Sequence, residues 1–113
     1  MDSAAREVQT EIREASAMAI NSGNTYRIDF SNGDKTYQLQ VRQNDTWVNV
    51  RGPETLPSSV VFSSDSPPSF GGDAYLECYA RGACESGTLV LKNSLGRIKT
   101  ILVDGETANV RVG

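Results

Sequence analysis

The 113-residue sequence contains no histidine, a single tryptophan and no long run of apolar residues. Without histidine, the chain lacks the side chain that most often serves as a base near neutral pH, and serine–histidine or cysteine–histidine catalytic arrangements are excluded. No stretch reaches the ~20 apolar residues that a helix needs to cross a bilayer, and no signal peptide with an apolar central region is present. These absences argue against an enzyme and predict no catalytic residues.

Charge and length set further bounds on function. The formal net charge is −3, which argues against a dedicated nucleic-acid binder, because counterion release requires clustered cations. A local basic patch could still override that total. A chain of this length is one domain on ordinary priors, so we expect a single domain over residues 1–113.

The two cysteines, Cys78 and Cys84, are separated by five residues and allow three interpretations. A disulfide that closes this small loop would stabilise the fold by roughly 2–3 kcal/mol on the loop-entropy estimate. Zinc is disfavoured, because the chain offers no histidine and no third cysteine as further ligands. Two free thiols are the alternative in a reducing compartment. We favour the disulfide, which indicates a location outside the cytoplasmic membrane.

No other metal site or cofactor is expected. Asp65, Asp73 and Glu77 lack the regular spacing of oxygen ligands that calcium-binding loops have. Gly71-Gly72 matches no phosphate-binding or dinucleotide-binding pattern and is better explained as loop flexibility.

Residues 2–22 contain neither proline nor glycine and predict an amphipathic helix that stops at Gly23. Small and aliphatic residues recur along it at spacings of three and four: Ala5, Val8, Ile12, Ala15 and Ala19. This stripe has two interpretations, a core face packed on a sheet and an assembly surface for neighbouring subunits. The charges on the rest of the helix could set subunit register or simply be solvated: Arg6, Glu7, Glu11, Arg13 and Glu14.

The remainder, residues 25–113, predicts antiparallel strands. Apolar alternation marks a first meander over 25–30, 35–42 and 46–51, with Asn32-Gly33 as a hairpin turn, and a second over 87–92, 97–103 and 108–112. Between them we expect short strands at 60–62 and 74–79, breaks at Gly52-Pro53 and Leu56-Pro57, and an irregular surface loop over 63–72. The expected fold is α+β, with the helix packed on two antiparallel β-meanders whose sheets could form a sandwich.

The helix begins abruptly after Met1, so we expect that it continues in an upstream segment, with residues 1–22 as a remnant. The closing segment carries a family resemblance: Gly87-Thr-Leu-Val-Leu-Lys-Asn93, Gly96-Arg97, Ile101-Leu-Val103 and Val110-Arg-Val112. Together with the helix exit Arg13-Glu-Ala-Ser-Ala-Met-Ala-Ile20, it resembles the type II secretion pseudopilin H and FimT family of minor type IV pilin-like proteins. The likeness runs in order through nearly the whole chain.

The resemblance implies a non-enzymatic subunit that initiates or caps a type IV pilus or a type II secretion pseudopilus. Such proteins have an apolar N-terminal helix that anchors them in the inner membrane and later packs in the filament core. The implied partners are other pilin or pseudopilin subunits and the inner membrane, with no small-molecule substrate. This domain would then face the periplasm or the cell exterior.

Two alternatives stay open. FimT-like pilins act as DNA receptors in natural transformation, and basic residues gather near the C-terminus of this chain: Lys92, Arg97, Lys99 and Arg111. Against them stand two acidic residues in the same segment, and the final strand lacks the arginine-rich tip of DNA receptors. The second alternative is a stand-alone soluble binding module that uses its hairpin loops and the 63–72 loop.

Overall fold

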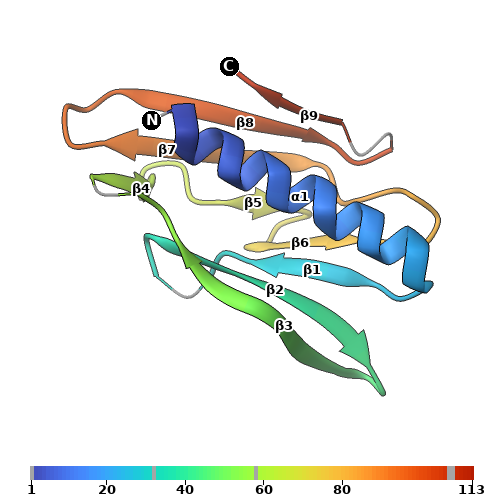
Figure 1. The fold of residues 1–113 in the computed structure, drawn as a ribbon. Coiled ribbons are helices and arrows are strands. Elements are labelled where there is room, and N and C mark those ends of the chain that lie inside the picture. Colours follow the sequence, from blue (N-terminus) through green and yellow to red (C-terminus); the bar gives the residue numbers. More distant parts are fainter. Residues whose placement is uncertain (1, 32, 58, 107–108) are drawn as a thin grey trace.

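The computed structural model describes residues 2–31, 33–57, 59–106 and 109–113. Met1, Asn32 and Ala108, which entered the sequence interpretation, lie outside this part of the chain. One helix, α1 (Asp2–Ser22), crosses one face of two antiparallel β-sheets (Figure 1). No helix in the described residues combines the length and apolar character needed to cross a membrane.

The first sheet has the strand order β3-β2-β1-β6, and the second has the order β4-β7-β8-β9 with β5 paired to β7. The strands of the first sheet are β1 (Tyr26–Asp29), β2 (Thr36–Gln43), β3 (Thr46–Thr55) and β6 (Tyr75–Cys78). Those of the second are β4 (Val60–Phe62), β5 (Ser69–Phe70), β7 (Gly87–Asn93), β8 (Ile98–Asp104) and β9 (Asn109–Val112). The α+β class and the two meanders, β1-β2-β3 and β7-β8-β9, are therefore confirmed.

The apolar stripe of α1 packs over the seam between the two sheets. Its side chains are at most 1% exposed: Ala5, Val8, Ile12, Ala15 and Ala19. The helix contacts β1 and β6 of the first sheet and β8 and β9 of the second, so one core serves both sheets. Because alanine has only a methyl group beyond the backbone, the stripe lets α1 lie close to both sheets, as Figure 1 shows.

The segment 63–72 differs from the expected irregular surface loop. It contains the short strand β5, and Phe70 is fully buried and stacks on Phe30 at 5.6 Å between ring centroids. Phe30 also meets Phe62 edge-on, so three aromatic rings from three segments form one cluster. A single phenylalanine between serine and glycine has no periodicity, and pattern reading therefore missed it.

Strand β3 also differs from expectation, because it runs through Gly52-Pro53 to Thr55 where a break was expected. It is an edge strand of the first sheet, a position in which proline is tolerated since one side of the strand needs no ladder partner. The register between β2 and β3 shifts beside Leu39, and Gln38 Nε2 donates a hydrogen bond to the carbonyl of Arg51 at this irregularity. The strand is thus bent but not interrupted.

Gly105 provides a test of the junction between the sheets. A Cβ atom at Gly105 would lie 1.8 Å from the carbonyl oxygen of Cys84, which is backbone and cannot rotate away. We expect Gly105→Ala to lower the free energy of unfolding by about 1–3 kcal/mol, measured by urea denaturation. Gly113→Ala is the matched control, because a Cβ there has no neighbour within 4 Å. Equal stability of the two variants would contradict the close approach.

Candidate functional site

Burial of the α1 stripe leaves the charged and polar side of the helix for contacts with other molecules. Arg6, Glu7, Thr10 and Arg13 are exposed on that side. Glu11, which the sequence places among the free charges, is instead buried at 5% exposure. Its burial is explained by a partner from the first sheet.

That partner is Arg51 on β3, whose Nη2 donates to both Glu11 Oε1 and Glu14 Oε2. The hydrogen bond that Arg51 donates to Glu11 raises the pKa of Arg51, and the one that it donates to Glu14 raises this pKa further, so the guanidinium stays charged. Glu11 and Glu14 are three residues apart and therefore neighbours on one side of the helix. Arg51 thus ties the edge strand β3 to α1. The sequence gives no signal for this pairing, because the residues are 37 and 40 positions apart.

A groove of about 460 Å³ follows this contact between α1 and β3. Tyr37, Thr10 and Thr55 line it, together with four glutamates and two arginines: Glu7, Glu11, Glu14, Glu54, Arg6 and Arg51. Burial raises the pKa of the Tyr37 hydroxyl, and the negative charges of Glu11 and Glu7 raise it further. The tyrosine therefore stays neutral, and this flank of the helix is acidic.

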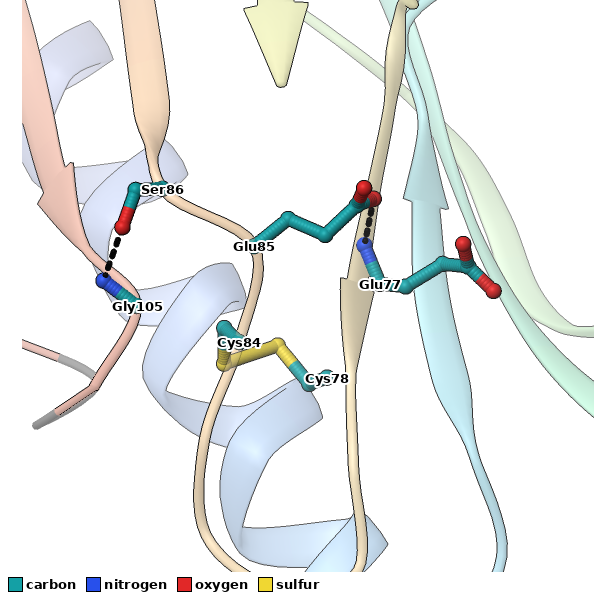
Figure 2. The surroundings of a disulfide bond; sticks show 6 residues. All are labelled: Glu77, Cys78, Cys84, Glu85, Ser86 and Gly105. Carbon is teal, nitrogen blue, oxygen red and sulfur yellow. Dashed lines mark hydrogen bonds between the residues drawn. A yellow bond between two sulfur atoms is a disulfide. The ribbon is translucent and has the colours of Figure 1, made fainter. Parts of the chain in front are cut away.

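Cys78 and Cys84 form a disulfide across a hairpin that connects the two sheets (Figure 2). Tyr79 N–H donates to the Ala83 carbonyl, and Glu85 N–H donates to the Glu77 carbonyl, so the cysteines lie between two backbone hydrogen bonds. Their Cα atoms are 4.0 Å apart, close to the spacing of directly opposed residues at a non-hydrogen-bonded position. The bond therefore links the end of β6 to a segment that already faces it.

The segment after Cys84 joins β6 to the turn between β8 and β9. Cys84 N–H donates to the Gly105 carbonyl at 2.7 Å. Figure 2 shows the neighbouring hydrogen bond, in which Gly105 N–H donates to Ser86 Oγ at 2.8 Å. Glu85 Oε1 also accepts a hydrogen bond from the Glu77 backbone N–H at 3.2 Å. Desolvation raises the pKa of Glu85, and the nearby negative charges of Glu77 and Asp73 raise it further. The hydrogen bond from the Glu77 backbone N–H lowers this pKa but does not cancel the rise.

On the sheet face away from α1, Arg27 lies between two aromatic rings. Its guanidinium carbon is 4.1 Å from the centroid of Trp47 and 4.2 Å from that of Tyr75, within the range of cation–π contacts. Arg27 Nε donates to Gln40 Oε1 at 2.7 Å, and Gln40 Nε2 donates to Asn49. The cluster spans β1, β2, β3 and β6. The sequence does not indicate this cluster, because the pairing of β1 with β6 and the register between β2 and β3 follow from the sheet topology.

The four basic residues near the C-terminus do not form one patch. Lys92 and Arg111 follow buried residues and lie on the face away from α1, across from Ile98 and Leu102 respectively. Those positions are four residues apart on β8, roughly 13 Å along a strand. Lys99 pairs with the buried Leu91 and therefore lies on the α1 side of the sheet. This division weakens the DNA interpretation, which needs the cations together.

Arg97 and Lys99 do come together at the turn between β7 and β8. They line an open groove of about 910 Å³ with Ser3 of the first turn of α1 and with Ile98. Asn93 holds this turn, because its Oδ1 accepts hydrogen bonds from the backbone N–H groups of Leu95 at 3.0 Å and Arg97 at 2.9 Å. The other flank of α1 is therefore basic.

Within the described residues, no group of three or more cysteine, aspartate or glutamate side chains is arranged to hold a metal ion.

Comparison with solved structures shows that the fold is that of minor pseudopilins and minor pilins. Two structures of the minor pseudopilin EpsH from the type 2 secretion system of Vibrio cholerae superpose with a TM-score of 0.72 at 13% and 14% identity. The match covers 96% of this chain and 92% and 89% of those chains. The type IV minor pilin FimU of Pseudomonas aeruginosa strain PAO1 superposes at 0.70 with 13% identity, over 100% of this chain and 92% of that one.

No family model and no curated protein matches the sequence. The expected pilin-like fold is therefore confirmed by structure, at a level of identity where sequence comparison alone finds no relative.

The contact between Arg51 and α1 can be tested by truncation. Arg51→Met leaves the buried carboxylate of Glu11 without its cation, and we expect a loss of about 1–3 kcal/mol in unfolding free energy. Adding Glu11→Gln should recover part of this loss, since the buried charge is removed. The control is Arg42→Met, whose partner Asp45 is 92% exposed and whose loss should cost at most about 1 kcal/mol. A similar loss in both single variants would contradict the special role of Arg51.

The raised pKa of Glu85 predicts a pH dependence. The folded protein holds this proton more tightly than the unfolded chain does. The protonated group therefore contributes stability at pH values below its ordinary pKa of 4.5. That contribution is lost as the pH rises through the raised pKa. We therefore expect Glu85→Gln to raise the melting temperature at pH 7 and to change it little at pH 4. Glu106→Gln, at an exposed turn position, is the control, and a Glu85→Gln gain that persists at pH 4 would contradict the assignment.

Proposed function

We propose that residues 1–113 form the globular domain of a minor pilin or pseudopilin, a non-enzymatic subunit that initiates or caps a type IV pilus or a type II secretion pseudopilus. The observation that carries this proposal is the superposition of nearly the whole chain on the minor pseudopilin EpsH and the minor pilin FimU. In this proposal α1 continues upstream as an apolar helix that anchors the subunit in the inner membrane. The domain then lies on the periplasmic or extracellular side.

Two features of the chain support an assembly role. The α1 stripe is buried in the domain's own core. Neighbouring subunits would therefore contact the charged side of the helix and its two flanks. These flanks differ in sign, with glutamates gathered beside β3 and cations beside the β7–β8 turn. Flanks of opposite charge suit side-by-side packing of similar subunits, because the acidic flank of one subunit can lie against the basic flank of the next and like charges are kept apart.

Site-specific photo-crosslinking of the full-length protein in its native cell tests the proposal. A benzophenone amino acid at the exposed Arg13 of α1 is expected to crosslink to other pilin-like subunits in the membrane and in sheared filaments. The same probe at Leu102, on the sheet face away from α1, is the control and should give no subunit crosslink. Recovery of the protein without pilin-like partners from both positions would reject the subunit role and favour a stand-alone binding module.

DNA uptake is the less favoured function. Its support was the cluster of Lys92, Arg97, Lys99 and Arg111, and the strand register divides these residues between two faces.

A further inference from the structure

An irregularity in β3 turns two charged side chains toward the groove between β3 and α1. Arg51 and Glu54 are three residues apart, so a regular strand would place them on opposite faces of the sheet. The register against β2 shifts at this point: Arg51 pairs with Leu39, and Glu54 pairs with Tyr37. Both of these partners are buried in the core under α1. Because directly paired residues share a face, the extra residue in β3 places Arg51 and Glu54 on the α1 side together.

Two carboxylates of this groove have no cation beside them. Arg51 is already bound to two other glutamates of α1. Glu7 on α1 and Glu54 on β3 form no ion pair within the described residues, and both are exposed. The lining as a whole, Arg6 included, carries an excess of two negative charges. The groove is therefore open to a cation from another molecule.

Tyr37 also lines the groove, although its ring belongs to the core. The residue is 3% exposed, and the centroid of its ring lies 6.1 Å from that of Phe30. In the described part of the chain its hydroxyl has no hydrogen-bond partner, while no side-chain oxygen or nitrogen that is fully shielded from solvent lacks one. The hydroxyl therefore opens into the groove. Burial raises its pKa, and the negative charges of Glu11, Glu7 and Glu54 raise it further, which places these carboxylates near the hydroxyl.

We propose that the groove between α1 and β3 receives a lysine side chain of a neighbouring pilin-like subunit, whose ammonium group lies between Glu7 and Glu54 and donates a hydrogen bond to the Tyr37 hydroxyl. This inference rests on the proposed function, since assembly brings the neighbouring subunit to α1. The lysine supplies the positive charge that the groove lacks. It also gives the Tyr37 hydroxyl the partner that its own chain does not provide.

The chemistry of the groove favours lysine over other ligands. An ammonium group carries three N–H donors on a compact charge, and the groove offers three free acceptors in two carboxylates and one hydroxyl. A guanidinium is planar and suits a single carboxylate that it can bind through two parallel hydrogen bonds. The acidic side chains of the described residues are not grouped to hold a metal ion. An anionic ligand would be repelled by the excess negative charge.

Zero-length crosslinking tests the contact in the full-length protein, in membranes and sheared filaments of its native cell. A carbodiimide joins a carboxylate only to an amine in direct contact with it. We expect tandem mass spectrometry to find an amide bond from Glu7 or Glu54 to a lysine of another pilin-like subunit. Asp45, whose side chain is 92% exposed at the β2–β3 turn, is the control and should not be coupled. Equal coupling of Asp45 and Glu54 would overturn the proposal, since exposure alone would then explain it.

The hydroxyl is tested on the 113-residue chain with a blocked glycine–lysine–glycine tripeptide and with the same tripeptide carrying norleucine in place of lysine. Nuclear magnetic resonance should show shifts at Tyr37 and Glu54 with the lysine peptide only. Tyr37→Phe should weaken this binding about fivefold, as loss of one hydrogen bond predicts, and leave the midpoint of urea denaturation unchanged. Tyr79→Phe, outside the groove, is the matched control and should bind as the parent does. Unchanged binding by Tyr37→Phe, or a loss of stability that reveals an internal partner, would overturn the proposal.

The two tests separate this contact from the subunit role. If the Arg13 probe crosslinks to pilin-like subunits while Glu7 and Glu54 couple to none, the lysine contact is wrong and the subunit role stands. Failure of the Arg13 crosslinks as well rejects the subunit role and with it the identity of the partner. The tripeptide titration then decides by itself whether the groove binds lysine.

Discussion

The close packing of small side chains on α1 against two sheets at once is the constraint on which the rest of the structure depends. Each sheet is too small to bury a core alone, and the helix supplies the surface that both share. Ala15 and Ala19 are fully buried, so a larger residue at either position would push the helix away from the sheets. The Arg51 contact with α1 ties the edge strand β3 to the helix, and the hairpin closed by Cys78 and Cys84 links the two sheets.

Much of the fold was predictable because its signals are local. The three- and four-residue spacing from Ala5 to Ala19 predicts the helix and its buried side, and alternation predicts the β7-β8-β9 meander nearly to its ends. The burial of Phe70 was not predictable, because one aromatic residue in a segment of serine, proline and glycine carries no period. The passage of β3 through Gly52-Pro53 was missed for a different reason, since a strand's place at a sheet edge is a property of the whole topology.

The candidate surfaces were predictable only in part. Arg97 and Lys99 were recognisable as a basic pair, but their separation from Lys92 and Arg111 follows from strand register, which composition does not contain. The partner of Glu11 lies on another element, and its position depends on how α1 crosses the first sheet. A sequence pattern indicates which face of a helix or strand is buried, but it does not indicate which other element packs against that face.

The cluster of Trp47, Arg27 and Tyr75 has a practical consequence. Trp47 is the single tryptophan of the chain and stands on the edge strand, so intrinsic fluorescence reports on the outermost part of the first sheet. The second sheet contains no tryptophan, whereas backbone circular dichroism reports on α1 and both sheets together. Coincidence of the two signals during denaturation would mean that the sheets unfold as one cooperative unit, as a shared core requires. An earlier fluorescence change would mark β3 as the part of the domain that opens first.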